Sequence, residues 1–184
     1  MKILKNLKEV SIGKFLHKYL LEYDINGKYF PYEIISRTKL STIDDLAKKA
    51  NAVEIVAKFK DGDILVCKEF RFPLNDFCYE FPAGLIDEGE SPEEAAIREL
   101  KEETGLNVIS IDKVLPMAYS SAGMTDEAII TVFMTIEGEF LGSDNNEKEE
   151  IYSYKMSKED IRILLERKDV KISHRCQLVL NSMI

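Results

Sequence analysis

The chain is poor in the residues that several common kinds of site require. Its 184 residues include two histidines, three cysteines and no tryptophan. A histidine-rich metal site and a Ser-His-Asp triad are therefore poorly supplied. Cys67, Cys78 and Cys176 form no C-x-x-C pair, so we expect reduced, partly buried thiols in a cytoplasmic protein.

An excess of positive charge and long apolar runs are also missing. The formal net charge is -8, which argues against a protein that binds a nucleic-acid backbone. No apolar run approaches the roughly 20 residues that span a bilayer, and the first residues lack the continuous apolar core of a secretory signal. The motifs G-x-G-x-x-G and G-x-x-x-x-G-K-[ST] do not occur. We therefore expect no nucleic-acid partner and no membrane partner.

What the chain does contain is a series of strands with few helices. Asn26-Gly27 predicts a β-hairpin within residues 15–37, and Asp61-Gly62 predicts another within residues 52–72. Residues 38–51 are typical of a polar loop with a short helical turn. The whole pattern indicates a mixed α/β arrangement rather than alternating βαβ units. Further strands are expected within residues 77–82, 108–120, 127–139 and 149–156, and helices within residues 157–168 and 173–183.

One more helix is specified at both of its ends. Ser91-Pro92-Glu93-Glu94 is a capping box with proline at the first helical position, and Gly105 is suited to a left-handed helix end. These signals predict a helix from about residue 92 to residue 104.

Carboxylates crowd this helix. Glu93 and Glu94 complement the dipole at its start, so a solvated acidic surface explains them. Glu99 and Glu103, four residues apart, share one face in the half where acidic residues oppose the dipole. A divalent cation such as Mg²⁺ would offset their mutual repulsion, so this pair is a candidate metal site.

The stretch from residue 84 to residue 106 resembles the Nudix box, G-x5-E-x7-R-E-U-x-E-E-x-G-U, in which U is an aliphatic residue. Nine defined positions at fixed spacing make this a highly specific signal. Every fixed position is matched, in the order Gly84, Glu90, Arg98, Glu99, Leu100, Glu102, Glu103, Gly105 and Leu106.

The resemblance implies both a fold and a reaction. The fold is an α/β/α sandwich with a mixed sheet, here residues 51–184, preceded by a small N-terminal antiparallel β annex, here residues 1–50. In this family the annex often exchanges between the subunits of a homodimer. The reaction is hydrolysis of a nucleoside diphosphate linked to another group, with Mg²⁺ or Mn²⁺ as cofactor.

Matching positions carry the family's roles over to this sequence. Glu99 and Glu103 resemble the principal metal ligands, and Glu102 adds to the metal set. Glu102 and Glu103 also resemble catalytic carboxylates. The backbone carbonyl of Ala83 resembles a further metal ligand. The positions that resemble structural parts of the motif are Gly84, Glu90, Arg98 and Gly105.

Flanking segments resemble the ADP-ribose pyrophosphatases of this family. Arg71, shortly before a proline, resembles an arginine that contacts substrate phosphates, and residues 80–84 match a typical E-[LF]-P-A-G run. In the loop at residues 119–127, Gly123 and Glu127 match substrate-contact positions. Ala122 departs from the pattern, because these enzymes usually have proline there.

Two more groups are implied by the resemblance alone. Glu147 and Glu149 match an E-x-E pair in an acidic loop, where Glu147 resembles the general base and Glu149 lies near the metals. In the annex, Tyr29 and Phe30 are candidates for stacking on the substrate base.

The leading hypothesis is a metal-dependent pyrophosphohydrolase that cleaves ADP-ribose, or a related nucleoside diphosphate sugar, to AMP and ribose 5-phosphate. Ala122 leaves another sugar nucleotide such as GDP-mannose open as substrate. A non-catalytic nucleotide-sensing module is the alternative from a different class. The complete set of Glu99, Glu102 and Glu103 argues against that alternative, since such modules typically lose box glutamates.

Overall fold

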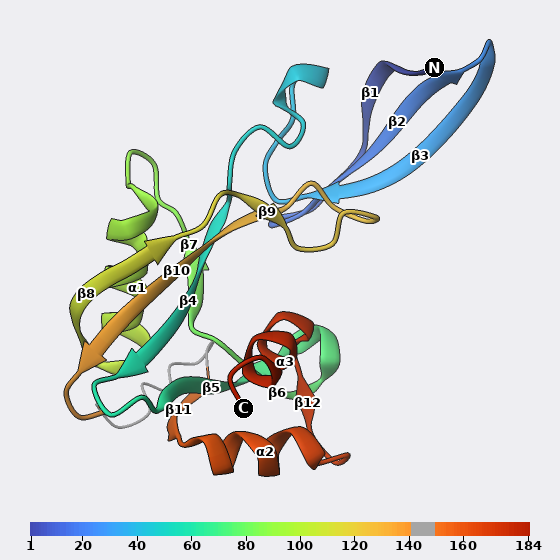
Figure 1. Cartoon of the computed structure of the whole chain (residues 1–184). Coiled ribbons are helices and arrows are strands. Elements are labelled where there is room, and N and C mark those ends of the chain that lie inside the picture. Colours follow the sequence, from blue (N-terminus) through green and yellow to red (C-terminus); the bar gives the residue numbers. More distant parts are fainter. Residues whose placement is uncertain (141–149) are drawn as a thin grey trace. The chain divides into compact units, whose positions relative to one another are not determined.

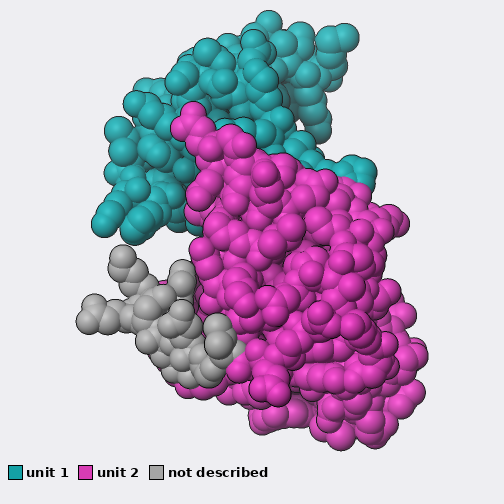
Figure 2. All heavy atoms as spheres, turned by 90° about the vertical axis from the view of Figure 1, so that its left-hand side faces the viewer, with its two compact units in different colours: residues 1–52, 116–130 teal, residues 53–115, 131–184 magenta. Residues whose placement is uncertain are grey.

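The structure is a computed structural model that describes residues 1–140 and 150–184. The chain divides into two compact units, coloured separately in Figure 2. The first contains residues 1–52 and 116–130, and the second contains residues 53–115 and 131–184. The expected functional division of the chain at residue 50 stays a prediction.

The first unit is built on a three-stranded antiparallel sheet in the order β1-β2-β3 (Figure 1). Its strands are β1 (Lys2–Ile12), β2 (His17–Ile25) and β3 (Lys28–Ser36). The predicted hairpin is confirmed: Asn26 and Gly27 turn with φ of 54° and 79°, as a type I′ turn requires. The short helical turn η1 (Ile43–Asp45) was also expected, whereas β1 was not. The buried core of this sheet consists of Tyr19, Leu21, Ile34 and Leu40.

Residues 116–130 belong to the same unit because backbone hydrogen bonds tie them to its N-terminal part. The amide of Ile35 donates to the carbonyl of Met124 at 3.1 Å, and the amide of Asn51 donates to the carbonyl of Ala128 at 2.8 Å. Within this stretch, β9 (Ala118–Tyr119) pairs with the start of β10 (Ala128–Glu137).

The large sheet has the strand order β12-β6-β5-β4-β10-β8 in the described part of the chain, with β11 paired to β5 and β7 to β4. It is mixed, because β12 runs parallel to β6 while β5 is antiparallel to both β6 and β11. The second predicted hairpin is confirmed, with Gly62 at φ 92° between β4 and β5. The strands not yet bounded are β4 (Ala52–Phe59), β5 (Ile64–Arg71), β6 (Asp76–Glu80), β7 (Ala83–Leu85), β8 (Asn107–Val114), β11 (Ile151–Met156) and β12 (Lys171–Ile172), with the short helix η2 (Phe72–Leu74) between β5 and β6.

Three helices cover the sheet of the second unit. Helix α1 (Pro92–Thr104) packs on β7 and β8, and α2 (Lys158–Glu166) and α3 (His174–Asn181) pack on β11 and β6 respectively. In Figure 1, α1 lies apart from the α2–α3 pair. The core beneath α2 and α3 buries large apolar side chains, each of which stabilises the fold by about 1.5–3 kcal/mol. It includes Val66, Tyr79, Phe81, Ile161 and Leu180. The expected mixed-sheet α/β fold with a separate N-terminal antiparallel sheet is confirmed.

All three cysteines are buried as free thiols. In the described residues, no helix is long and apolar enough to cross a membrane.

Candidate active site

Helix α1 is fixed at both ends by the residues that predict it. The Ser91 hydroxyl accepts from the amide of Glu94 at 3.2 Å, and the Glu94 carboxylate accepts from the amide of Ser91 at 2.8 Å. Gly105 ends the helix at φ 76°, where a side chain would be strained. Thr104 is buried and donates its hydroxyl to the carbonyl of Leu100 at 2.6 Å. The carboxylates of this helix are therefore carried by a rigid element.

Arg98 joins the helix to the loop before it. Its guanidinium donates to both oxygens of Glu90 at 2.9 Å and to the carbonyl of Leu85 at 3.0 Å. It also donates to Glu99 at 2.7 Å and to Glu102 at 3.3 Å. The hydrogen bond from Arg98 lowers the pKa of Glu90, and the same bond raises the pKa of Arg98. The bidentate pair thus fixes the loop, while one edge of the guanidinium orients Glu99.

Gly84 leaves room for the Glu99 carboxylate. A Cβ placed at Gly84 would lie 1.9 Å from the carboxyl carbon and 2.0 Å from one carboxylate oxygen. The side chain of Glu99 therefore occupies the space that any larger residue at position 84 would need. Because β7 carries both Ala83 and Gly84, the backbone of that strand borders the Glu99 carboxylate.

Glu103 lies in a poorly solvated and negatively charged environment. Burial raises its pKa well above the ordinary value, and the negative charges of Glu69 and Glu99 raise it further. A backbone hydrogen bond from Ala83 and the positive charge of Arg71 act in the opposite direction without cancelling the shift. A nearby cation would favour the ionised form of this carboxyl group.

Arg71 at the end of β5 is held by two carboxylates. Its Nε donates to Glu80 at 2.6 Å, and its Nη1 forms an ion pair with Glu69 at 2.8 Å. Burial lowers the pKa of Arg71, but the contacts with Glu80 and Glu69 outweigh that effect and raise it overall. Cys67 on the same strand has a thiol whose pKa is raised by burial, so it is unsuited to be a nucleophile.

The side chains around α1 and β5 carry surplus negative charge. Two guanidinium groups, of Arg71 and Arg98, face six carboxylates, which leaves an excess of four negative charges when all are ionised. A bound cation, or protonation of Glu103, would reduce such an excess in a partly buried site. The six carboxylates are those of Glu69, Glu80, Glu90, Glu99, Glu102 and Glu103.

The donor set suits a hard divalent cation that keeps some of its water. Within the described residues, no group of three or more His, Cys, Asp or Glu side chains is arranged to hold a metal ion. Mg²⁺ is usually bound through one or two carboxylates together with waters and substrate phosphates, so it needs no such cage. Glu99 and Glu103, with the bordering backbone at Ala83, fit that requirement. The Glu102 side chain is 61% exposed, and its carboxylate lies 3.3 Å from Arg98, farther than the 2.7 Å of Glu99.

The candidate substrate contacts at Gly123 and Glu127 lie in the first unit. The Glu127 carboxylate accepts from the Ser120 hydroxyl at 2.7 Å and is ion-paired with Arg37. The carbonyl of Gly123 accepts from the hydroxyl of Tyr32 at 2.7 Å. Both residues thus help to fasten the loop at residues 119–127 to the N-terminal sheet.

The candidate stacking residues also belong to the first unit. Tyr29 is 64% exposed, and its hydroxyl donates to Glu22 at 3.1 Å. Phe30 is 46% exposed and stacks on Tyr32, with ring centroids 6.5 Å apart. In a single chain, the rings of Tyr29 and Phe30 are therefore exposed to solvent. Glu147 and Glu149 lie outside the described residues.

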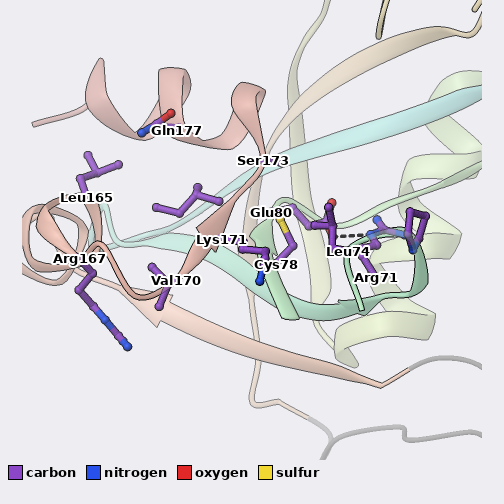
Figure 3. Close-up of a pocket in the computed structure, with 12 residues that line it drawn as sticks. Arg71, Leu74, Cys78, Glu80, Leu165, Arg167, Val170, Lys171, Ser173 and Gln177 are labelled. Atoms are coloured by element: carbon purple, nitrogen blue, oxygen red, sulfur yellow. Dashed lines mark hydrogen bonds and ion pairs between the residues drawn. The ribbon is translucent and has the colours of Figure 1, made fainter. Parts of the chain in front are cut away.

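A pocket of about 690 Å³ opens beside β6 and β12 in the second unit (Figure 3). Arg71 and Glu80 form part of its wall, and the dashed line in Figure 3 marks the contact between these two residues. Neither the Arg71–Glu80 pair nor the pocket was predicted from the sequence. The one available signal was that Glu69 and Arg71, two residues apart on a strand, share a face. The other lining residues include Leu165, Lys171, Ile172, Ser173 and Gln177.

Comparison with known proteins connects this geometry to a family. Residues 48–176 match the model of the NUDIX domain. The chain is 32% identical to an ADP-ribose pyrophosphatase of Bacillus subtilis (strain 168), over 91% of this chain and 88% of that protein. It is 31% identical to an ADP-ribose pyrophosphatase of Saccharomyces cerevisiae, over 98% of this chain and 81% of that protein. A solved structure described as an ADP compounds hydrolase shares the fold, with a TM-score of 0.74 and 24% identity over 98% of this chain and 92% of that chain.

Proposed function

The chain belongs to the NUDIX domain family, as its box predicts, and from that membership we propose that it is a divalent-metal-dependent pyrophosphohydrolase. The substrate is ADP-ribose or a related nucleoside diphosphate sugar, and ADP-ribose is cleaved to AMP and ribose 5-phosphate. The observation that carries the proposal is the surplus of negative charge around Glu99 and Glu103, on a helix whose sequence matches the family's box at every fixed position. The names of the relatives from Bacillus subtilis and Saccharomyces cerevisiae support the choice of substrate.

The metal ion would be held by Glu99, Glu103 and the carbonyl of Ala83, with Glu102 and Glu149 as further ligands. Mg²⁺ or Mn²⁺, when bound, neutralises phosphate charge and lowers the pKa of a coordinated water. Gly84 keeps the space for the Glu99 carboxylate, and Gly105 ends the helix that carries both principal ligands.

The remaining residues orient the reacting groups. Arg98 is fixed by Glu90 and in turn holds the Glu99 carboxylate at 2.7 Å. Arg71 binds the substrate phosphates, a role suited to a guanidinium because its planar fork matches phosphate oxygens. Glu147 accepts the proton of the attacking water as general base.

Substrate binding in the first unit uses Tyr29, Phe30, Gly123 and Glu127. Tyr29 and Phe30 offer aromatic surface for stacking on the base. We propose a homodimer in which the N-terminal sheet brings these residues to the substrate, and we propose that the protein works in the cytoplasm.

The test is hydrolysis of ADP-ribose by the purified protein with Mg²⁺, with products separated by chromatography. Glu103→Gln is the test variant, and Glu93→Gln, at the start of the same helix, is the matched control. We expect AMP from the parent protein and from Glu93→Gln, and a loss of at least about 100-fold in kcat for Glu103→Gln, since removing one charged catalytic group typically costs this much.

A panel with GDP-mannose and other sugar nucleotides separates the substrate from the chemistry. Cleavage of another sugar nucleotide without cleavage of ADP-ribose would contradict the proposed substrate. It would leave the proposed type of reaction in place. Binding of nucleotides without any cleavage, with either Mg²⁺ or Mn²⁺, would contradict the proposal in favour of a sensing module.

A further inference from the structure

Arg71 stands at a boundary between two very different surroundings. On one side it contributes to the field at Glu103, within the cluster of carboxylates around α1. On the other side it lines the pocket of about 690 Å³, whose apolar walls and open space would accommodate other conformations of a long side chain (Figure 3). Some interaction must therefore select the conformation that keeps the guanidinium near the catalytic carboxylates.

We infer that Glu80 is a positioning residue for Arg71, holding its guanidinium in the orientation that binds substrate phosphate. The inference rests on the proposed function, because it takes Arg71 as the phosphate-binding residue. Neither the box nor its spacing assigns a role to Glu80, which lies four residues before Gly84.

The contact geometry supports a clamp with one side open. Glu80 accepts from Nε of Arg71 at 2.6 Å, and Glu69 lies 2.8 Å from Nη1. Both carboxylate side chains are 14% exposed, whereas Arg71 is 38% exposed. These two contacts engage Nε and Nη1 of the guanidinium. Two carboxylates thus fix the inner edge of the fork and leave outward N–H groups for an anion.

The clamp is built on paired strands, which makes it stiff. Glu69 and Arg71 are two residues apart on β5 and therefore share a face. Glu80 on β6 pairs with Cys67 of β5, which places it on that same face. Groups held by neighbouring strands keep their geometry better than groups held by loops.

Positioning and simple charge predict opposite results for the isosteric variant Glu80→Gln. If Glu80 acted only as a negative charge, its removal would reduce repulsion of an anionic substrate and lower KM. If Glu80 positions Arg71, the weaker neutral contact would release the guanidinium toward the pocket, and KM would rise. The sign of the change in KM therefore distinguishes the two roles.

The experiment measures kcat and KM for the parent protein and Glu80→Gln with Mg²⁺ and ADP-ribose, or the sugar nucleotide that the parent cleaves. We expect KM to rise about three- to tenfold with kcat changed less than about twofold, because a contact equal in ground and transition states affects KM alone. Asp76→Asn is the matched control, since Asp76 is another ion-paired carboxylate of β6 and contacts Lys171. Its KM should stay within about twofold of the parent value.

A double-mutant cycle with Arg71→Lys shows whether Glu80 acts through Arg71. Lysine keeps the charge but lacks the fork, so Glu80→Gln should change KM less than about twofold in that background. The ¹H–¹⁵N signal of Arg71 Nε, assigned by its loss in Arg71→Lys, provides a readout that does not depend on catalysis. We expect this signal to be resolved in the parent and to shift or broaden in Glu80→Gln.

Each outcome bears on a separate claim. An active parent whose KM is unchanged or lowered by Glu80→Gln overturns the positioning role and leaves the proposed function in place. The same effect of Glu80→Gln in both Arg71 backgrounds also overturns it. A parent that cleaves no nucleoside diphosphate compound removes the proposed function, and the role of Glu80 in it falls as well.

Discussion

At the scale of single residues, the ionised Glu103 carboxylate destabilises the folded, metal-free protein. Its pKa is raised first by burial and then by the charges of Glu69 and Glu99, so ionising it in the metal-free protein costs free energy. A carboxyl group whose folded pKa is raised binds protons more tightly in the folded state. Its contribution therefore makes the metal-free protein less stable as pH rises above the ordinary carboxyl value of 4.5.

Glu103→Gln should consequently stabilise the metal-free protein while it abolishes activity. We expect Tm in EDTA at neutral pH to rise, by about 2–4 °C for each 1 kcal/mol of relieved repulsion in a chain of this size. Added Mg²⁺ should raise the Tm of the parent but not that of the variant, since only the parent keeps both principal ligands. A variant that melts several degrees below the parent in EDTA would show that the carboxylate is structural.

Gly84 presents a second case in which stability and activity separate. The alanine methyl group of Gly84→Ala would lie about 2 Å from the Glu99 carboxylate, so that side chain must move. The atoms to be displaced belong to the flexible end of a side chain, and the backbone of Gly84 does not have a positive φ. The free energy of unfolding should therefore change by less than about 1 kcal/mol.

The activity of Gly84→Ala should fall by at least about 100-fold, because even small misplacements of catalytic groups are expensive. Steady-state kinetics and thermal unfolding of the same preparation provide the two measurements. Gly89→Ala is a useful contrast: Gly89 has φ 85° and open space around it, so its substitution should strain the loop backbone without touching Glu99. Retention of full activity by Gly84→Ala would contradict the placement of Glu99 against β7.

At the scale of elements, α1 acts as a preformed carrier of ligands, and its first turn can be weakened alone. Ser91→Ala removes the side-chain cap and should cost about 1 kcal/mol, or about 2–4 °C in Tm. Arg98 still holds Glu90 and Glu99 in this variant, so kcat/KM should fall less than about threefold. Ser157→Ala, which removes the equivalent cap of α2, is the matched control for stability.

The same capping box predicts a pH dependence. Hydrogen bonds from the backbone amide and from the hydroxyl of Ser91 lower the pKa of Glu94, so their stabilisation is complete at neutral pH and is lost as pH falls below the ordinary value of 4.5. Ser91→Ala keeps the amide bond and removes the hydroxyl bond of 2.8 Å. The difference in Tm between the parent and Ser91→Ala should narrow in acid. A constant difference down to the acid transition would show that the bond from the Ser91 hydroxyl to the Glu94 carboxylate contributes nothing to the cap.

Elements whose signals are local could be predicted from the sequence. The turns at Asn26-Gly27 and Asp61-Gly62 and the capped helices α1 and α2 depend on neighbouring residues, and the structure confirms all of them. The short strands β7 and β12 were missed, because two or three residues carry too little pattern and become strands only by pairing with β4 and β6.

At the scale of the whole molecule, contacts between residues far apart in the chain could not be predicted from the sequence. The pairing of Arg71 with Glu80 depends on the register of β5 against β6, and the link of Arg37 to Glu127 joins residues that are 90 positions apart. Family resemblance supplied positions for the site, whereas the partners of each charge came only from the fold. The box therefore predicts which residues meet a metal, but not what holds Arg71.

The exposed apolar side chains of the first unit lead to a prediction about assembly. Ile12 at the end of β1 is 72% exposed, and Phe15 in the turn between β1 and β2 is 70% exposed. Neighbouring exposed apolar residues of this kind favour a partner surface. The expected partner is a second copy of the chain, so the protein should sediment at about twice its mass of 21.1 kDa. Phe15→Glu should shift it toward the monomer, because a buried unpaired carboxylate would oppose the interface.

Ile163→Glu is the matched control for this shift. Ile163 is 54% exposed on α2 in the second unit, where no role in assembly is proposed, so its substitution by glutamate should leave the sedimentation coefficient unchanged. If the parent protein sediments at the mass of one chain over the range of concentrations used for kinetics, the homodimer is excluded. Tyr29 and Phe30 would then have to serve the substrate of their own chain. The two states also predict different kinetics: an active dimer loses specific activity on dilution below its dissociation constant, whereas a monomeric enzyme keeps it.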